Sequence, residues 1–80
     1  MKFYYTYVLK LNSDSLYIGS CNDLEKRIAD HANGRVKTTK KDRPLKLVYF
    51  EGCLVKKKAI QRENELKTGF GRGYLKRRID

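Results

Sequence analysis

The fold is decided by residues 3–20, which read FYYTYVLKLNSDSLYIGS. Residues 3–11 are rich in β-branched and aromatic side chains, and residues 16–19 repeat this composition over a shorter stretch, so both segments are predicted to be strands. Between them, residues 12–15 (NSDS) form a cluster of turn-favouring side chains. Two strands joined by so short a connection pair as an antiparallel hairpin.

A first helix is predicted directly after the hairpin. Asn22 or Asp23 can cap its start by accepting a hydrogen bond from a backbone N–H. Gly34 suits a left-handed conformation at its end. Apolar residues recur every fourth position and give the helix one apolar stripe, formed by Leu24, Ile28 and Ala32.

The second half of the chain predicts a third strand and two more helical segments. The strand is expected over residues 45–50, with Gly52 closing it, and a helix over residues 54–67. Three glycines in residues 68–73 are expected to break that helix before a short helix or helical tail over residues 74–79. The predicted fold is therefore α/β of the α+β type, a three-stranded antiparallel sheet flanked by helices in the order ββαβαα.

Composition predicts a single basic domain over residues 1–80. Nineteen Lys and Arg against nine Asp and Glu leave a net charge of +10, which favours a polyanionic partner such as nucleic acid. No apolar run approaches the ~18 residues that a membrane span needs, and no signal peptide is visible, so we expect no membrane partner and a cytoplasmic location. Cys21 and Cys53 lack zinc-site spacing and are expected to be reduced thiols.

Two short motifs in the hairpin resemble the half-motifs that name the GIY-YIG nuclease superfamily. Residues 5–7 read YTY and residues 17–19 read YIG, and the second matches the family pattern letter for letter. Tyr7 and Tyr17 are ten positions apart, a spacing that the family commonly shows. The chain is most similar to the small single-domain branch related to the N-terminal nuclease domain of the bacterial excision-repair protein UvrC, which implies a role in DNA repair.

Three further positions extend this resemblance over about residues 4–78. An Arg on the first helix is Arg27, a His four residues later is His31, and a Glu on the helix after the third strand is Glu63. The resemblance implies that Arg27 binds the scissile phosphate and that Glu63 holds one Mg²⁺ or Mn²⁺ ion. It also implies that Tyr7 activates or orients the attacking water, with Tyr17 in a supporting role.

The chemistry of these residues supports the same roles. Arg27 and His31 share a helix face, because they are four residues apart, and they can reach the sheet edge without entering the core. The planar guanidinium of Arg27 matches two phosphoryl oxygens, although an ion pair with Asp23 or Asp30 is the ordinary alternative. His31 titrates near neutrality and can orient water or contact phosphate, or it is simply a solvated residue on the helix flank.

Glu63 lies within the apolar stripe of the second predicted helix, among Ala59, Ile60 and Leu66. A carboxylate there is costly unless it is paired or binds a metal. Mg²⁺ is often held by one or two protein carboxylates, together with phosphate oxygens and waters. The alternative is a structural ion pair with Arg62 or Lys67.

The hairpin register decides whether the two motif tyrosines can act together. If Leu11 lies opposite Tyr17, the rings of Tyr7 and Tyr17 share one face of the sheet, whereas Leu11 opposite Leu16 separates them. We predict that they share one face.

Beyond Arg27, nucleic-acid binding is predicted for the basic loop of residues 35–43. Its cations are Arg35, Lys37, Lys40, Lys41 and Arg43. The sequence thus predicts a metal-dependent endonuclease acting on nucleic acid, with DNA favoured as substrate and a recruiting protein as a second partner. The alternative is a non-catalytic basic nucleic-acid-binding module with the same fold, which is favoured by Ser20 where many family members place a Lys.

Overall fold

The computed structural model describes residues 2–79 and contains three strands and three α-helices in the predicted order ββαβαα. The strands are β1 (Tyr4–Lys10), β2 (Leu16–Cys21) and β3 (Lys46–Cys53), and they form one antiparallel sheet in the order β2-β1-β3. Both β2 and β3 are therefore edge strands. The helices are α1 (Leu24–Ala32), α2 (Lys56–Leu66) and α3 (Gly69–Ile79), with a short 3₁₀ turn, η1 (Lys40–Asp42), before β3.

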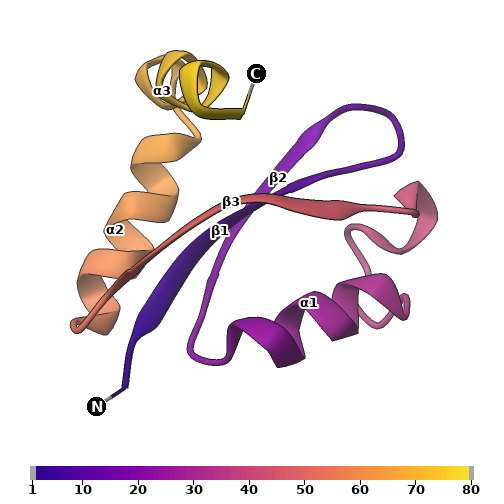
Figure 1. The fold of residues 1–80 in the computed structure, drawn as a ribbon, viewed down its shortest axis with the longest axis horizontal. Coiled ribbons are helices and arrows are strands. Elements are labelled where there is room, and N and C mark those ends of the chain that lie inside the picture. Colours follow the sequence, from indigo (N-terminus) through magenta and orange to yellow (C-terminus); the bar gives the residue numbers. More distant parts are fainter. Residues whose placement is uncertain (1, 80) are drawn as a thin grey trace.

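The sheet separates two layers of helix, with α1 on one face and α2 and α3 on the other (Figure 1). Alternation along β1 explains this arrangement, since successive side chains of a strand point to opposite faces. Thr6 points toward α2 and donates its hydroxyl hydrogen bond to the Ala59 carbonyl at 2.8 Å. Tyr7, the next residue, points toward α1 and contacts His31.

The larger apolar core lies between the sheet and the α2–α3 pair. Its fully buried members are Val8, Leu66 and Leu75, with Ile18 and Tyr49 among the residues packed around them. Ile60, which the sequence placed on the buried stripe of α2, is instead 42% exposed. The stripe of α2 is narrower than predicted, because Ala59 and Leu66 are the buried residues of this helix.

The caps of α1 follow the sequence prediction. The Asp23 side chain accepts a hydrogen bond from the Lys26 backbone N–H at 3.1 Å, and Gly34 follows the helix with a φ of +75°. The 3₁₀ turn that follows is hydrogen-bonded to the β1–β2 turn. Its Asp42 carboxylate accepts hydrogen bonds from the backbone N–H and the hydroxyl of Ser13 in that turn. This contact fixes one end of the basic loop.

Two predicted boundaries were wrong. Strand β3 continues through Gly52 to Cys53, because Gly52 pairs with Tyr5 in the ladder. Helix α3 begins at Gly69, so the glycines that were expected to break the helix lie inside one. The backbone of Gly71 packs so closely on α2 that an added Cβ would lie 2.2 Å from the Leu66 carbonyl oxygen. Glycine at this position allows the two helices to pack.

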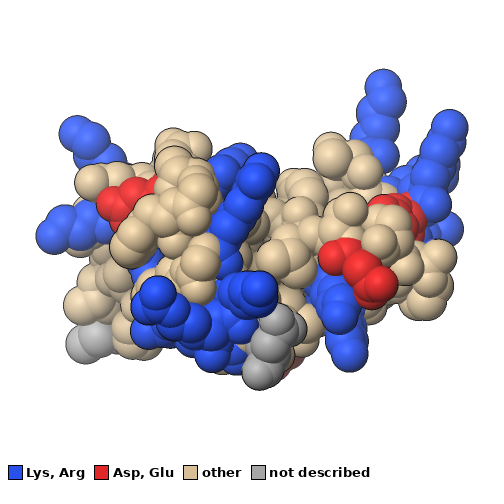
Figure 2. All heavy atoms as spheres, turned by 90° about the horizontal axis from the view of Figure 1, so that it is seen from above, with Lys and Arg blue, Asp and Glu red and all other residues tan. Residues whose placement is uncertain are grey.

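Positive charge covers much of the molecular surface. Figure 2 looks onto the end of the molecule that carries α3, where Lys and Arg side chains spread widely and Asp and Glu side chains form only small patches. Such a surface attracts polyanions. None of the helices in the described part of the chain is long and apolar enough to cross a membrane.

Candidate active site

The two motif tyrosines lie on the same face of the sheet, as predicted. Tyr17 pairs with Leu9, two positions from the predicted partner, and Tyr7 pairs with Gly19, so the parity of the register is the predicted one. The ring centroids of Tyr7 and Tyr17 are 6.3 Å apart. A Cβ added to Gly19 would lie 2.6 Å from the Tyr7 hydroxyl, so glycine leaves the space that the Tyr7 ring occupies.

Helix α1 brings Arg27 and His31 onto this tyrosine pair. The Tyr7 hydroxyl lies 2.9 Å from Nε2 of His31, and Nε of Arg27 donates a longer hydrogen bond of 3.4 Å to the same hydroxyl. The ring of His31 also packs edge-on against Tyr17, with centroids 5.0 Å apart. The structure therefore joins four of the five predicted catalytic residues in one contact network.

His31 is fully buried, which corrects the expectation that it stays outside the core. Its second ring nitrogen, Nδ1, lies 2.8 Å from the hydroxyl of Thr39, a buried residue of the basic loop. Both ring nitrogens are thus hydrogen-bonded, so the imidazole can be buried without an unsatisfied polar atom. Thr39 was not among the predicted site residues, because a single threonine in a basic loop carries no sign of such a partner.

Burial sets the protonation of this network. It is the largest cause of the raised pKa of Tyr7, which is about 12, although the hydrogen bond from Arg27 opposes the rise. Burial, together with the positive charge of Arg27, also lowers the pKa of His31. A neutral imidazole offers one donor and one acceptor, which match the hydroxyls of Tyr7 and Thr39 at its two ring nitrogens. At neutral pH Tyr7 and His31 are therefore uncharged, whereas Arg27 keeps its positive charge.

Glu63 approaches from the opposite layer of the molecule. It lies on α2 and, with Tyr17, lines an open hollow of about 530 Å³ beside the edge strand β2, whose walls also include Lys67 and Arg72. The Glu63 side chain is 20% exposed, and its carboxylate accepts a hydrogen bond of 2.8 Å from the ammonium of Lys67. Tyr17 is therefore the residue that links the hollow to the tyrosine–histidine network.

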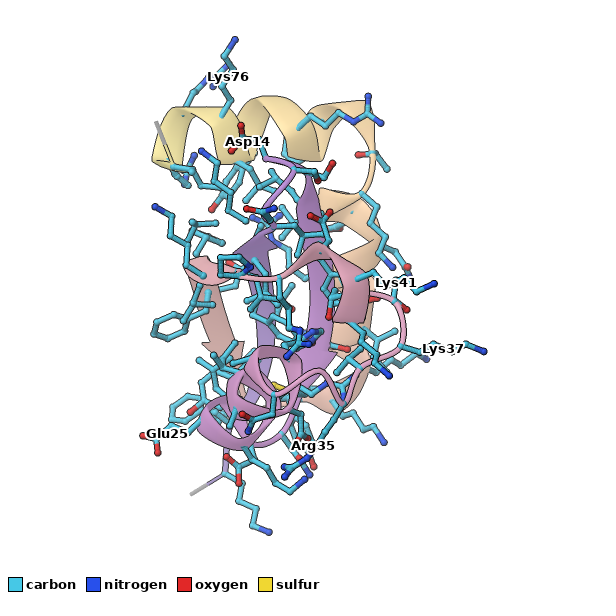
Figure 3. The ribbon with its side chains drawn as sticks, turned by 90° about the vertical axis from the view of Figure 1, so that its right-hand side faces the viewer. Asp14, Glu25, Arg35, Lys37, Lys41 and Lys76 are labelled. Carbon is cyan, nitrogen blue, oxygen red and sulfur yellow. The ribbon has the colours of Figure 1, made fainter. Side chains whose placement is uncertain are left out.

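The predicted nucleic-acid-binding cations of the loop divide into two groups. Arg35 forms an ion pair with Asp30, and Arg43 donates hydrogen bonds to the carbonyls of Lys40 and Ala32, so both contribute to the packing around the end of α1. The other three, Lys37, Lys40 and Lys41, are exposed. Figure 3 shows Lys37 and Lys41 pointing away from the body of the protein.

The residues around Glu63 fit a single hard cation. The carboxylate lies in a hollow open to solvent and already attracts the positive charge of Lys67. One carboxylate, completed by waters and phosphate oxygens, is a donor set that Mg²⁺ accepts in proteins. Within residues 2–79, no cluster of three His, Cys, Asp or Glu side chains offers an all-protein metal site. A cation at Glu63 would therefore take its other ligands from water and from the phosphate of a substrate.

The fold and site define a class of protein that comparison with known families identifies. Residues 3–77 match the family model described as the GIY-YIG catalytic domain. The chain therefore belongs to the GIY-YIG family, a nuclease superfamily, and the resemblance seen in the two half-motifs is confirmed.

Within this family the chain is similar to UPF0213 proteins of bacteria. It is 46% identical over 69 residues to a UPF0213 protein of Staphylococcus saprophyticus, covering 85% of this chain and 84% of the relative. A UPF0213 protein of Clostridium perfringens is 48% identical over 64 residues, which cover 79% of this chain and 69% of the relative. The solution NMR structure of a UPF0213 protein from Bacillus halodurans superimposes with a TM-score of 0.57 at 30% identity, covering 91% of this chain and 81% of that one.

Proposed function

We propose that the protein is a metal-dependent endonuclease that hydrolyses a phosphodiester bond in nucleic acid, with DNA as the favoured substrate. One observation carries the proposal. Tyr7, Arg27, His31 and Tyr17 form a single contact network, and Tyr17 carries that network to the hollow that also holds Glu63. Tyr17 and Glu63 are the two predicted catalytic residues in the wall of this open hollow.

The two tyrosines have different roles in this proposal. Tyr7 is 0% exposed, and its hydroxyl already contacts Arg27 and His31, so it positions these side chains. Tyr17 is only partly buried and is among the residues that line the hollow, so in this proposal its hydroxyl holds the attacking water in line with the scissile bond. The sequence pattern favoured Tyr7 for this role, but the burial of Tyr7 favours Tyr17.

Arg27 is the phosphate-binding residue of the proposal. Its Nε is directed to Tyr7, and this hydrogen bond is the largest cause of its raised pKa, so the guanidinium keeps its charge. The terminal nitrogens can bind two phosphoryl oxygens. In that position the positive charge of Arg27 stabilises the negative charge that builds up as water attacks phosphorus and the bond to the leaving oxygen breaks.

Glu63 is the metal-binding residue of the proposal. A bound Mg²⁺ or Mn²⁺ would supply Lewis-acid stabilisation of the leaving oxygen. Glu63 would hold this ion, and the Lys67 ammonium that now pairs with the carboxylate would have to give up that contact. Hydrolysis proceeds without a covalent intermediate, since water is the nucleophile.

The same ion pair favours a second candidate function. If Lys67 remains on Glu63, the chain keeps the fold and the basic surface but cannot hold the metal. Ser20, where many family members carry a Lys, removes a further cation from β2. The protein would then be a non-catalytic nucleic-acid-binding module.

A matched pair of carboxylates on α2 tests the two candidates. We expect wild type to nick supercoiled plasmid with Mg²⁺ or Mn²⁺ at low salt. Glu63→Gln should still bind DNA but should nick at least about 100-fold more slowly, because the metal would no longer stabilise the transition state by several kcal/mol. Glu65→Gln is the control, because Glu65 is exposed and pairs with Arg62 outside the hollow. Tight binding without nicking by any of the three proteins would select the binding module.

The finer expectations of location and partner belong to this proposal. We infer a cytoplasmic location, in which the thiols of Cys21 and Cys53 would stay reduced. We also infer that a recruiting protein directs the domain to its substrate, in keeping with a role in DNA repair.

A further inference from the structure

The hollow of the candidate active site continues along α3. A second hollow, of about 350 Å³, lies between α3 and the β1–β2 turn and is lined by Lys10, Asp14 and Lys76. The two hollows share Leu16 and Arg72 as wall residues. The two adjoining hollows, taken together, are called the groove; it extends from Tyr17 and Glu63 to Lys76, which projects from the α3 end of the molecule in Figure 3.

The charges of this groove favour a polyanion. Its two carboxylates, Glu63 and Asp14, are paired with Lys67 and Lys10, at 2.8 Å and 3.7 Å respectively. Among residues 2–79, the two remaining cations of the groove, Arg72 and Lys76, take part in no ion pair. The groove therefore carries a surplus positive charge, on the face where Figure 2 shows Lys and Arg side chains over α3.

The spacing of the two cations suits a phosphodiester backbone. Arg72 and Lys76 are four residues apart, so they project from the same side of α3 at positions about 6 Å apart along its axis. Both side chains can then contact neighbouring phosphates of one strand. The guanidinium of Arg72, placed between the two hollows, offers the planar fork that matches phosphate oxygens.

We propose that one nucleic-acid strand leaves the candidate active site along this groove, with its backbone held by Arg72 and Lys76. The inference rests on the proposed function for the position of the scissile phosphate and adds the path of the strand. It differs from the sequence prediction, which assigned backbone binding to the loop of residues 35–43. Arg72 had no part in that prediction, because the glycines on either side of it were read as a break between helices.

Binding of a short oligonucleotide tests the groove separately from cleavage. The probe is a fluorescein-labelled single-stranded 15-mer, as DNA and as RNA, whose dissociation constant is measured by fluorescence anisotropy from 50 to 200 mM salt without divalent metal. The test variant is Arg72→Gln/Lys76→Gln. Its matched control is Lys57→Gln/Lys58→Gln, which removes the same charge from exposed positions of α2 that line neither hollow.

We expect the groove variant to lose affinity at least about tenfold at 50 mM salt, and its slope of log affinity against log salt to become shallower by roughly 1.4, the value for two lost contacts to a single strand. The control should keep the wild-type slope. Equal losses in both variants, or no loss in the groove variant, would overturn the proposal. Comparison of the two probes assigns the strand to DNA or RNA.

The outcome is distinguishable from failure of the nuclease proposal. If the groove variant shows the shallower salt slope but wild type does not nick plasmid, the proposed strand path is supported and the nuclease proposal is rejected. If wild type nicks plasmid but the groove variant keeps the wild-type salt slope, the nuclease proposal is supported and the proposed strand path is rejected.

Discussion

His31 connects the parts of the candidate site that come from different segments of the chain. Its ring contacts Tyr7 from β1, Tyr17 from β2 and Thr39 from the basic loop. Because both nitrogens are hydrogen-bonded and the ring is fully buried, the side chain has little freedom. A residue held in this way orients its neighbours, and it does so best as a neutral imidazole.

Stability should therefore depend on pH through His31. Burial first and Arg27 second lower its pKa in the folded state, with Asp30 opposing. The unfolded chain then takes up more protons as the pH falls below about 6.5, so acidification lowers the free energy of unfolding. We expect wild type to lose stability between pH 7.5 and 5.5 in urea denaturation. His31→Gln, although less stable at pH 7.5, should show a flatter dependence, and equal dependence in both proteins would contradict the buried neutral imidazole.

Spacing alone predicted that Arg27 and His31 share a helix face, and the structure confirms it. Spacing could not predict that His31 is buried, because that depends on a hydroxyl eight residues away that becomes a neighbour only when the loop folds back. Glu63 was placed within an apolar stripe that proves narrower than predicted, and its ion-pair partner in the structure, Lys67, was one of the two alternatives weighed.

Helix α3 depends on one of its three glycines. Gly71 is buried against Leu66, and a Cβ there would lie 2.2 Å from the Leu66 carbonyl oxygen, whereas nothing lies within 4 Å of the corresponding position at Gly73. The helix can therefore approach α2 closely at one point only. Elsewhere its glycines reduce helix stability without a packing reason.

Alanine substitutions should separate these two roles. We expect Gly71→Ala to lower the free energy of unfolding by about 1–3 kcal/mol, because the backbone of α2 must move. Gly73→Ala should raise it by roughly 0.5–1 kcal/mol, since alanine loses less chain entropy in a helix. Urea denaturation of both variants gives the values, and destabilisation of similar size in both would show that the α2–α3 contact is not the cause.

The elements of the hairpin were easier to predict than α3. Aromatic and β-branched side chains identify β1 and β2 directly, and the parity of their register follows from placing both motif tyrosines on one face. Residues 69–73 have poor helix propensity, yet they are helical because α3 packs its Leu75 into the core. Such a tertiary contact is invisible in local sequence.

At the scale of the whole molecule, the candidate site joins two layers. The tyrosine–histidine network lies between α1 and the sheet, whereas Glu63 lies on α2 behind it, and the two meet because β2 is an edge strand with Tyr17 beside the hollow. The edge position of β2 leaves this junction open to solvent. The net charge of +10 favours a polyanionic partner for the molecule as a whole.

The most direct test is the rate of metal-dependent plasmid nicking by Tyr17→Phe, which removes only the hydroxyl that the account places at the attacking water. Tyr49→Phe is the matched control, because Tyr49 contacts Glu51 and Tyr74 on the other face of the sheet. We expect wild type and Tyr49→Phe to nick at similar rates and Tyr17→Phe to be slower by at least about 100-fold, with an unchanged melting temperature. Nicking by Tyr17→Phe at the wild-type rate, or no nicking by wild type with either metal, would contradict it.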